Sequence, residues 1–138
     1  MTKYISLLLL FSNSVYADTT WKPIRVVDGD TVKFEAPWVP EPLKPEISIR
    51  VMGIDTPEKA PHSKCNYENM LAHKATDFTE QFIKNGESIS VNLIGWDKYG
   101  GRMLGYIIVD GEDLSTQLIK NGYARPYHGE KKQSWCTK

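Results

Sequence analysis

The segment ISIRVMGIDTPEKA, residues 47–60, combines a strand with an acidic turn. Apolar and polar residues alternate over positions 47–51, which is typical of a half-buried β-strand. A glycine interrupts the pattern, and Asp55 and Glu58 then follow on either side of a proline. Arg50 lies on the strand itself, a few residues before the first acid. The segment therefore predicts a rigid strand that presents a basic side chain beside a loop with two carboxylates.

The rest of the chain predicts more short strands and two helices. Alternation marks four further strands, near residues 21–27, 31–36, 89–93 and 102–109. A helical period covers residues 68–84, with one apolar face formed by Leu71, Ala75, Phe78 and Phe82. A short second helix follows around Leu114–Ile119. This order predicts a mainly β, α+β domain: a five-stranded OB-fold Greek-key barrel with an inserted helix and a short C-terminal helix. A two-layer α+β sandwich is the alternative.

The first residues have the pattern of a targeting segment. Lys3 precedes an apolar run that is too short for a permanent membrane anchor. Small residues before the expected cleavage point favour a signal peptide over residues 1–17, removed after Ala17. The alternative is a buried first strand or helix. We therefore expect a mature domain over residues 18–138, secreted or periplasmic, with no membrane insertion once mature.

Charge and cysteine content limit how the chain can bind nucleic acid and what its cysteines can do. The chain has 17 basic and 17 acidic residues, so it is not a polycation that binds nucleic acid by net charge alone. Any phosphate binding must be local. In an exported chain the two cysteines, Cys65 and Cys136, favour a disulfide; a metal site is the rival, but the sequence has no CxxC or HxxxH spacing.

Carboxylates occur in two predicted turns. Asp28 and Asp30 flank a glycine, and Asp55 and Glu58 form the acidic loop. Taken singly, each turn has an ordinary structural explanation, as a hairpin or a helix cap. Together they offer hard oxygen ligands of the kind that suits Ca²⁺ or Mg²⁺. A glutamate near such an ion could deprotonate a water molecule or orient it.

Two arginines complete the candidate site. Arg50 precedes the acidic loop, and Arg102 follows the turn DKYGG at residues 97–101. A strand arginine is usually solvated or paired with a nearby acid. Two guanidinium groups can, however, bind one phosphate bidentately and stabilise charge that develops on it. Metal, water base and paired arginines would make a phosphodiester hydrolysis site.

Three segments, taken in order, resemble a known family. VVDGDTV at residues 26–32, RVMGIDTPE at 50–58 and DKYGGRMLGY at 97–106 are similar to the signature segments of the staphylococcal nuclease-like (thermonuclease) family. DGDT alone is weakly specific, but the three in order are strongly specific. The resemblance covers residues 24–127. It implies a five-stranded OB barrel and Ca²⁺-dependent cleavage of DNA and RNA that leaves 3′-phosphate ends.

The resemblance also implies a role for each matching residue. Asp30, Asp55 and the backbone carbonyl of Thr56 would bind calcium, and Asp28 would support these ligands from behind. Glu58 matches the residue assigned as general base, although base and water-orienting roles both stay open. The arginines that bind phosphate are matched by Arg50 and Arg102.

The chain departs from the family pattern in two places. Gly101 is an extra residue before Arg102, which leaves the placement of Lys98 and Tyr99 near the phosphate open. The chain also ends soon after Tyr127, and its tail resembles a shorter exported bacterial branch in which we expect the Cys65–Cys136 bridge to hold the end down. Tyr127 is expected either to stack on a base or to pack on the domain.

We therefore expect an exported, monomeric calcium-dependent nuclease that acts on DNA and RNA. The main alternative is a non-catalytic OB-fold module that binds single strands. Such a module has no reason to keep every acid and arginine of the family pattern. A structural or adhesive domain explains the cysteines but not the arrangement of acids and arginines.

Overall fold

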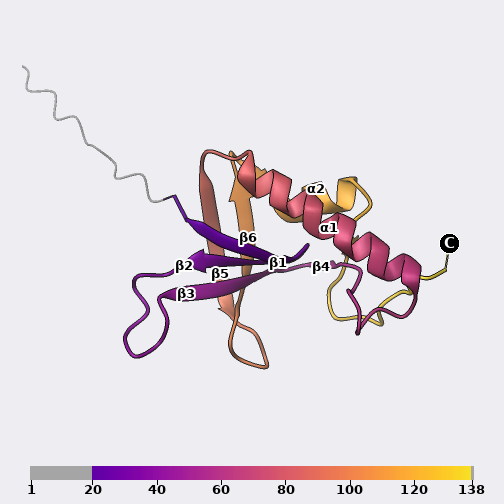
Figure 1. Cartoon of the computed structure of the whole chain (residues 1–138), viewed down its shortest axis with the longest axis horizontal. Coiled ribbons are helices and arrows are strands. Elements are labelled where there is room, and N and C mark those ends of the chain that lie inside the picture. The colour runs from indigo at the N-terminus through magenta and orange to yellow at the C-terminus, as the bar shows by residue number, and fades with distance from the viewer. Residues whose placement is uncertain (1–19, 138) are drawn as a thin grey trace, which may run out of the picture.

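The computed structural model describes residues 20–137. The signal peptide expected over residues 1–17 lies outside this range. Strands and helices follow in the order β1 Pro23–Asp28, β2 Thr31–Glu35, β3 Glu46–Val51, β4 Ile54–Asp55, α1 Asn66–Lys84, β5 Ile89–Trp96, β6 Met103–Val109, β7 Glu112–Asp113, α2 Leu114–Lys120 and β8 Arg125–Pro126. Figure 1 shows the two helices on one side of a curved sheet.

The main sheet has the strand order β1-β2-β3-β6-β5, and β7 extends it from β6. β3 and β6 run parallel, whereas the other neighbours are antiparallel. The backbone N–H of Trp21 donates to the carbonyl of Ile89 at 2.8 Å, so the chain just before β1 contacts the start of β5. This arrangement confirms the predicted α+β class and is consistent with an OB-fold barrel. The three two-residue strands β4, β7 and β8 are additional to the predicted five.

The core lies between the sheet and the helices. Alternation places Val32, Phe34, Ile47, Ile49 and Val51 inward, and all five are buried. Leucines 114 and 118 of α2 are fully buried and complete this cluster. Each fully buried aliphatic or aromatic side chain contributes about 1.5–3 kcal/mol. The strand that carries Arg50 is therefore fixed along its whole inner face.

The buried face of α1 matches the predicted one at Ala75 but differs from it elsewhere. The most buried positions include Ala72, Ala75 and Thr79, whereas Phe78 and Phe82 are only half-buried and pack at the edge of the core. The reason is a close approach to the β1–β2 turn: a Cβ on Gly29 would lie 2.9 Å from the Cβ of Ala75. Only small side chains fit at that contact, so the large apolar residues lie beside it.

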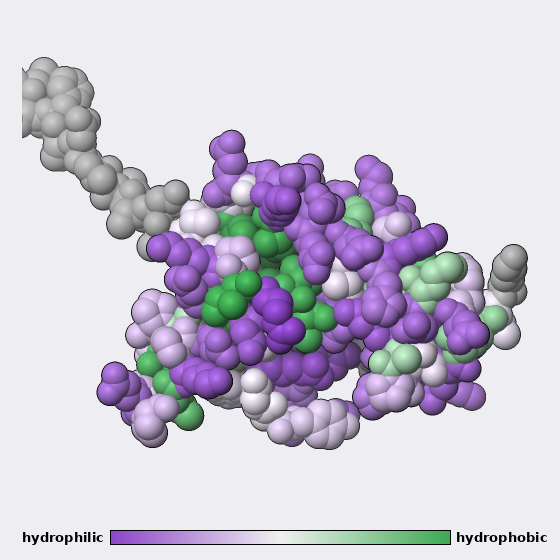
Figure 2. Space-filling model, in the orientation of Figure 1, coloured by the Kyte–Doolittle hydropathy of each residue, from purple (hydrophilic) through white to green (hydrophobic). Residues whose placement is uncertain are grey.

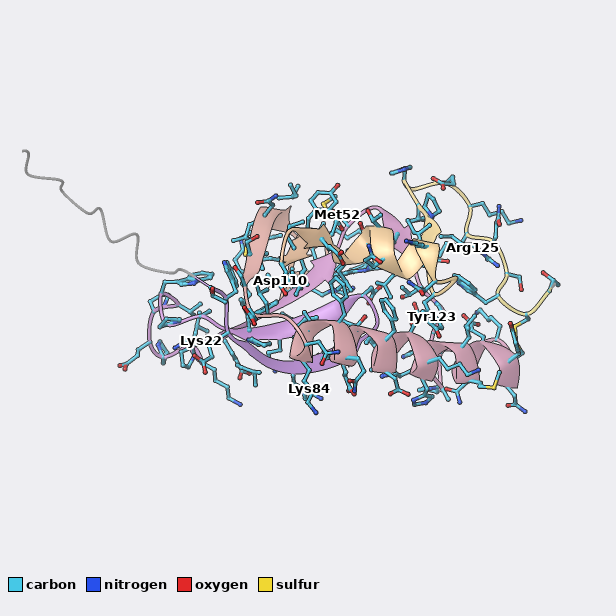
Figure 3. The ribbon with its side chains drawn as sticks, turned by 90° about the horizontal axis from the view of Figure 1, so that it is seen from above. Lys22, Met52, Lys84, Asp110, Tyr123 and Arg125 are labelled. Atoms are coloured by element: carbon cyan, nitrogen blue, oxygen red, sulfur yellow. A yellow bond between two sulfur atoms is a disulfide. The ribbon has the colours of Figure 1, made fainter. Side chains whose placement is uncertain are left out.

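The two cysteines are bonded to each other. Cys65 and Cys136 form a disulfide with their Cα atoms 6.1 Å apart, which confirms the predicted bridge. Cys65 also caps α1, since its sulfur accepts from the backbone N–H of Glu68. Figure 3 shows the disulfide at the first turn of α1. Within residues 20–137, neither helix is both long and apolar enough to cross a membrane.

Candidate active site

The β1–β2 turn places a buried aspartate against the strand arginine. Asp30 is 8 % exposed, and its carboxylate accepts from the hydroxyl of Thr31 at 2.9 Å. The Nε of Arg50 lies 3.6 Å from the other oxygen of Asp30. The backbone carbonyl of Asp30 accepts from the N–H of Val51 at 2.8 Å, which ties the turn to β3. Residues from two distant signature segments therefore meet here.

Asp28 lies at the outer side of the same turn. Its carboxylate is 3.4 Å from the ammonium of Lys59, which also donates to the carbonyl of Val27 at 3.0 Å. Asp28 is half-exposed, and its contact with Lys59 links the turn to the acidic loop.

The acidic loop is fixed at both of its ends. Asp55 belongs to β4, which pairs with β8, and is 6 % exposed. The loop beyond it is held by Glu68, whose buried carboxylate accepts from the backbone N–H groups of Glu58 at 3.0 Å and Lys64 at 2.7 Å. Asp55, Thr56 and Glu58 line one cavity of about 290 Å³.

Glu58 lies where several charges act together. The pKa of Glu58 is raised from its ordinary value, mainly because surrounding protein desolvates the carboxylate and secondly because Asp30 repels its charge. Lys132 and Arg50 act in the opposite direction. Glu58 itself is nevertheless exposed to solvent. A carboxylate with a raised pKa is a stronger base, which suits the role that the family pattern assigns to Glu58.

A charged loop positions the second arginine. The guanidinium of Arg102 is ion-paired with Asp97, and the backbone N–H of Asp97 donates to the carbonyl of Arg102 at 2.9 Å. Arg102 and the N–H of Tyr99 lower the pKa of Asp97, and the charge of Arg50 adds to the effect. Gly100 and Gly101 have positive φ, which glycine adopts without strain. The extra glycine lengthens the turn, and Arg102 still reaches Asp97.

Both arginines act on Asp97, so they belong to one region. The parallel pairing of β3 and β6 explains this, since Arg50 faces Leu104 in the register. A groove of about 660 Å³ runs over these two strands. Arg50, Trp96, Asp97, Lys98 and Tyr127 are among its lining residues.

The residues expected to contact nucleic acid lie in different places relative to the groove. Lys98 and Tyr127 line the groove. Tyr99 is 80 % exposed and lies outside the lining, with the Lys98 ammonium 5.0 Å from its ring centre. Tyr123 packs against Phe78, and Figure 3 shows it between the two helices. Figure 2 shows a largely hydrophilic face, with apolar groups over the strands and at the β2–β3 loop.

The donor set suits a hard cation. Asp30 and Asp55 are buried carboxylates, and each already faces a positive side chain, Arg50 and Lys132 respectively. Among residues 20–137, no group of three or more His, Cys, Asp or Glu side chains has a metal-binding arrangement. A metal ion here would therefore rely on two carboxylates, a backbone carbonyl such as that of Thr56, and water, which is the ligand chemistry of Ca²⁺ or Mg²⁺.

Comparison with known proteins decides the family. The family model described as "Staphylococcal nuclease homologue" matches residues 48–137. The chain belongs to the staphylococcal nuclease family. It is 34 % identical over 110 residues to "Endonuclease YhcR" of Bacillus subtilis, which covers 75 % of this chain and 8 % of that protein. It is 30 % identical over 110 residues to "Thermonuclease" of Staphylococcus hyicus, covering 78 % and 59 % respectively.

Another relative is "Endonuclease YncB" of Bacillus subtilis, 29 % identical over 103 residues, which cover 73 % of this chain and 44 % of that protein. The chain thus spans less than two thirds of the length of each of these three family members.

Sequence reasoning missed three members of the site. The sequence pattern places Asp97 in a turn, although an acid five residues before Arg102 is also a signal for an ion pair. Lys132 and Trp135 both contact Asp55 from the tail. The predicted disulfide was the available signal for them, because Trp135 immediately precedes Cys136 and must lie near the acidic loop.

Proposed function

We propose that this protein is a calcium-dependent nuclease that hydrolyses phosphodiester bonds of DNA and RNA. The observation that carries the proposal is the position of Arg50. Its guanidinium is paired with Asp30, and its charge also acts on Glu58 and Asp97. The proposed phosphate-binding guanidinium is thus close to Asp30 and Glu58, the two acids that the family pattern places at the reaction centre. The names of the relatives support the same activity.

The arginines would bind the phosphate and stabilise its transition state. The ion pair with Asp30 restricts the orientation of Arg50 before a substrate arrives, so less entropy is lost on binding. Arg102 is held in the same way by Asp97. Charge-assisted, bidentate bonds from guanidinium groups strengthen as negative charge grows on the phosphate oxygens. Lysine at either position would lose that geometry.

The acids would supply the metal site and the base. Calcium bound by Asp30, Asp55 and the carbonyl of Thr56 would supply Lewis-acid stabilisation of the phosphate. Glu58 would accept a proton from the attacking water, or orient that water, at its carboxylate oxygens. Asp28 would hold Lys59 and thereby the distance between the two acidic segments.

The groove gives a path for the rest of the substrate. Lys98 offers a charge for a neighbouring phosphate, and Tyr127 and Trp96 offer aromatic surfaces for bases. We further propose that the mature protein is exported, secreted or periplasmic, after cleavage following Ala17, and that it acts as a monomer. The disulfide supports export, because such bonds persist in oxidising compartments.

The test is digestion of single-stranded DNA by the oxidised protein with Ca²⁺, with Mg²⁺ and with chelator. We expect cleavage with Ca²⁺ and none with chelator. Glu58→Gln should reduce kcat by about 10²–10⁴-fold, the usual contribution of a general base. Arg50→Lys should also lose most of the rate. Glu35→Gln and Arg25→Lys, at exposed positions of β2 and β1, are the matched controls.

The outcomes separate the two candidate functions. Cleavage that is insensitive to chelator and to Glu58→Gln would refute the proposed mechanism. A folded protein that retains DNA without cleaving it would instead be the non-catalytic binding module.

A further inference from the structure

The C-terminal tail, residues 128–137, folds back against the acidic loop. The disulfide joins Cys136 to the residue that caps α1. Next to it, Trp135 is 9 % exposed, and the guanidinium of Arg125 lies 3.8 Å from the centre of its ring. Arg125 also donates to the carbonyls of Gln133 at 3.2 Å and Ser134 at 3.0 Å. Figure 1 shows this segment beside the acidic loop. Bridge, stacking and hydrogen bonds together fix Trp135.

The tail provides a separate partner for each oxygen of Asp55. The indole N–H of Trp135 donates to Oδ2 at 3.1 Å. The ammonium of Lys132 lies 3.3 Å from Oδ1. The two partners differ in kind, since the indole is a neutral, buried donor, whereas the Lys132 side chain is charged and 44 % exposed.

A neutral donor and a cation affect metal binding in opposite directions. A hydrogen bond to one oxygen of a ligating carboxylate orients the other oxygen and does not repel a metal. An ammonium on the other oxygen competes with the metal for the same negative charge. The Lys132 ammonium is also 5.3 Å from the centre of the Tyr127 ring, a cation–π contact that can hold the ammonium when a metal displaces it from Asp55.

We propose that Trp135 is a positioning residue for Asp55 and that Lys132 is a built-in counter-ion, which metal binding displaces from Asp55. The proposal rests on the proposed function, because it takes Asp55 as a metal ligand. It makes the tail part of the metal site: its tryptophan raises metal affinity and its lysine lowers it.

The experiment is calorimetric titration of Ca²⁺ into the oxidised chain, without substrate. Trp135→Phe keeps an aromatic ring for Arg125 but removes the N–H donor. It should weaken Ca²⁺ binding by about 10-fold or more, the usual effect of losing a hydrogen bond to a metal ligand. Lys132→Gln should tighten binding by about two- to fivefold, the strength of a part-exposed ion pair. Trp38→Phe and Lys131→Gln, both exposed, are the matched controls and should change affinity by less than about twofold.

Thermal unfolding gives a second readout that loss of packing alone would not produce. In chelator, Lys132→Gln should melt at a lower temperature than the unmodified chain, because buried Asp55 loses its counter-ion. Saturating Ca²⁺ should raise the melting temperature of this variant by more than that of the unmodified chain, because linkage follows affinity. If Trp135→Phe fails to fold, the positioning role is withdrawn, and the sign of the Lys132→Gln effect decides the counter-ion role.

Asp55→Asn separates the two ways to fail. If the unmodified chain binds no Ca²⁺, or if Asp55→Asn binds it equally well, the proposed metal site is wrong and this inference falls with it. If Asp55→Asn abolishes binding but Lys132→Gln weakens affinity or leaves it unchanged, the counter-ion proposal alone is overturned. A folded Trp135→Phe variant with unaltered affinity overturns the positioning role.

Discussion

Replacing Thr79 by valine removes one hydrogen bond between α1 and the β1–β2 turn while it keeps the shape of the side chain. The hydroxyl of Thr79 donates to the carbonyl of Gly29 at 2.7 Å, and Thr79 is fully buried. Gly29 lies between Asp28 and Asp30, so this bond connects the longest helix to the turn that carries the first acids. Valine cannot donate, and the carbonyl would stay buried without its partner.

The expected loss of stability comes from the unpaired carbonyl of Gly29. A buried polar group that loses its partner costs about 1–3 kcal/mol. For a domain of this size, the loss corresponds to a fall in melting temperature of about 3–10 °C. The assay is urea and thermal unfolding of the oxidised protein in chelator, so that metal binding does not contribute.

Thr76→Val is a matched control on the same helix. The hydroxyl of Thr76 is also buried, but it donates to the carbonyl of Ala72, one turn back on the helix. That carbonyl already accepts a backbone bond from the helix itself, so nothing is left unpaired. We expect a change within about 0.5 kcal/mol. If both variants lose the same stability, or if Thr79→Val loses none, the connection between α1 and the turn is not what stabilises this contact.

Three further perturbations test other parts of the structure. Asp97→Asn should lower the melting temperature at pH 7. The pKa of Asp97 in the folded protein lies below its ordinary 3.8, so the ionised carboxylate stabilises the fold above that pH and this stabilisation is lost as the pH falls. The difference in melting temperature between the variant and the unmodified chain should therefore close below about pH 4. A gap independent of pH would rule out the ionised Asp97–Arg102 pair as its source. Trp96→Ala should raise KM for single-stranded DNA about tenfold through lost base stacking, with kcat unchanged, whereas the exposed Trp38→Ala should alter neither; equal KM values would remove Trp96 from the binding path. Replacing both half-cystines by serine should reduce the free energy of unfolding in urea by about 2–5 kcal/mol, and a negligible loss would show that the tail is held without the bridge.

The strand framework was predictable because each strand obeys a local rule. Alternation identified the buried face of β3, and Asp-Gly marked the β1–β2 turn. The succession of short strands and two helices indicated the OB class, and the family resemblance implied the same class. The order of the strands in the sheet was not predicted, since alternation alone does not tell which strands pair. The parallel contact of β3 with β6 therefore had no local signal.

The helix face was only partly right, for a physical reason. The helical period selected Leu71, Ala75, Phe78 and Phe82, of which Ala75 is fully buried while Phe78 and Phe82 pack at the edge of the core. The actual contact with Gly29 demands a small side chain, so Ala75 lies at the centre of it. A close approach between backbones depends on the partner segment, which the helix sequence does not contain.

The candidate site was only partly accessible from sequence. Arg50 and Asp30 are indeed paired, and Glu58 lies within reach of both their charges. The partners of Asp55 could not be derived in the same way, since Trp135 is 80 residues away along the chain. A disulfide prediction places the tail near the loop, but it does not say which atom of which side chain meets the carboxylate.

The parallel pairing of β3 with β6 also bears on how the domain folds. Ile49 and Met103 come from opposite halves of the domain, and the whole of α1 and β5 lies between them in sequence. Contacts of such long sequence separation lose much loop-closure entropy and slow the folding of two-state domains. The β1–β2 hairpin, with Asp28 and Asp30 at its turn, and the β5–β6 hairpin, with Asp97 and Arg102 at its turn, can each form locally before β3 pairs with β6. If both arginines bind the phosphate as proposed, that capacity should appear in refolding only once β3 has paired with β6.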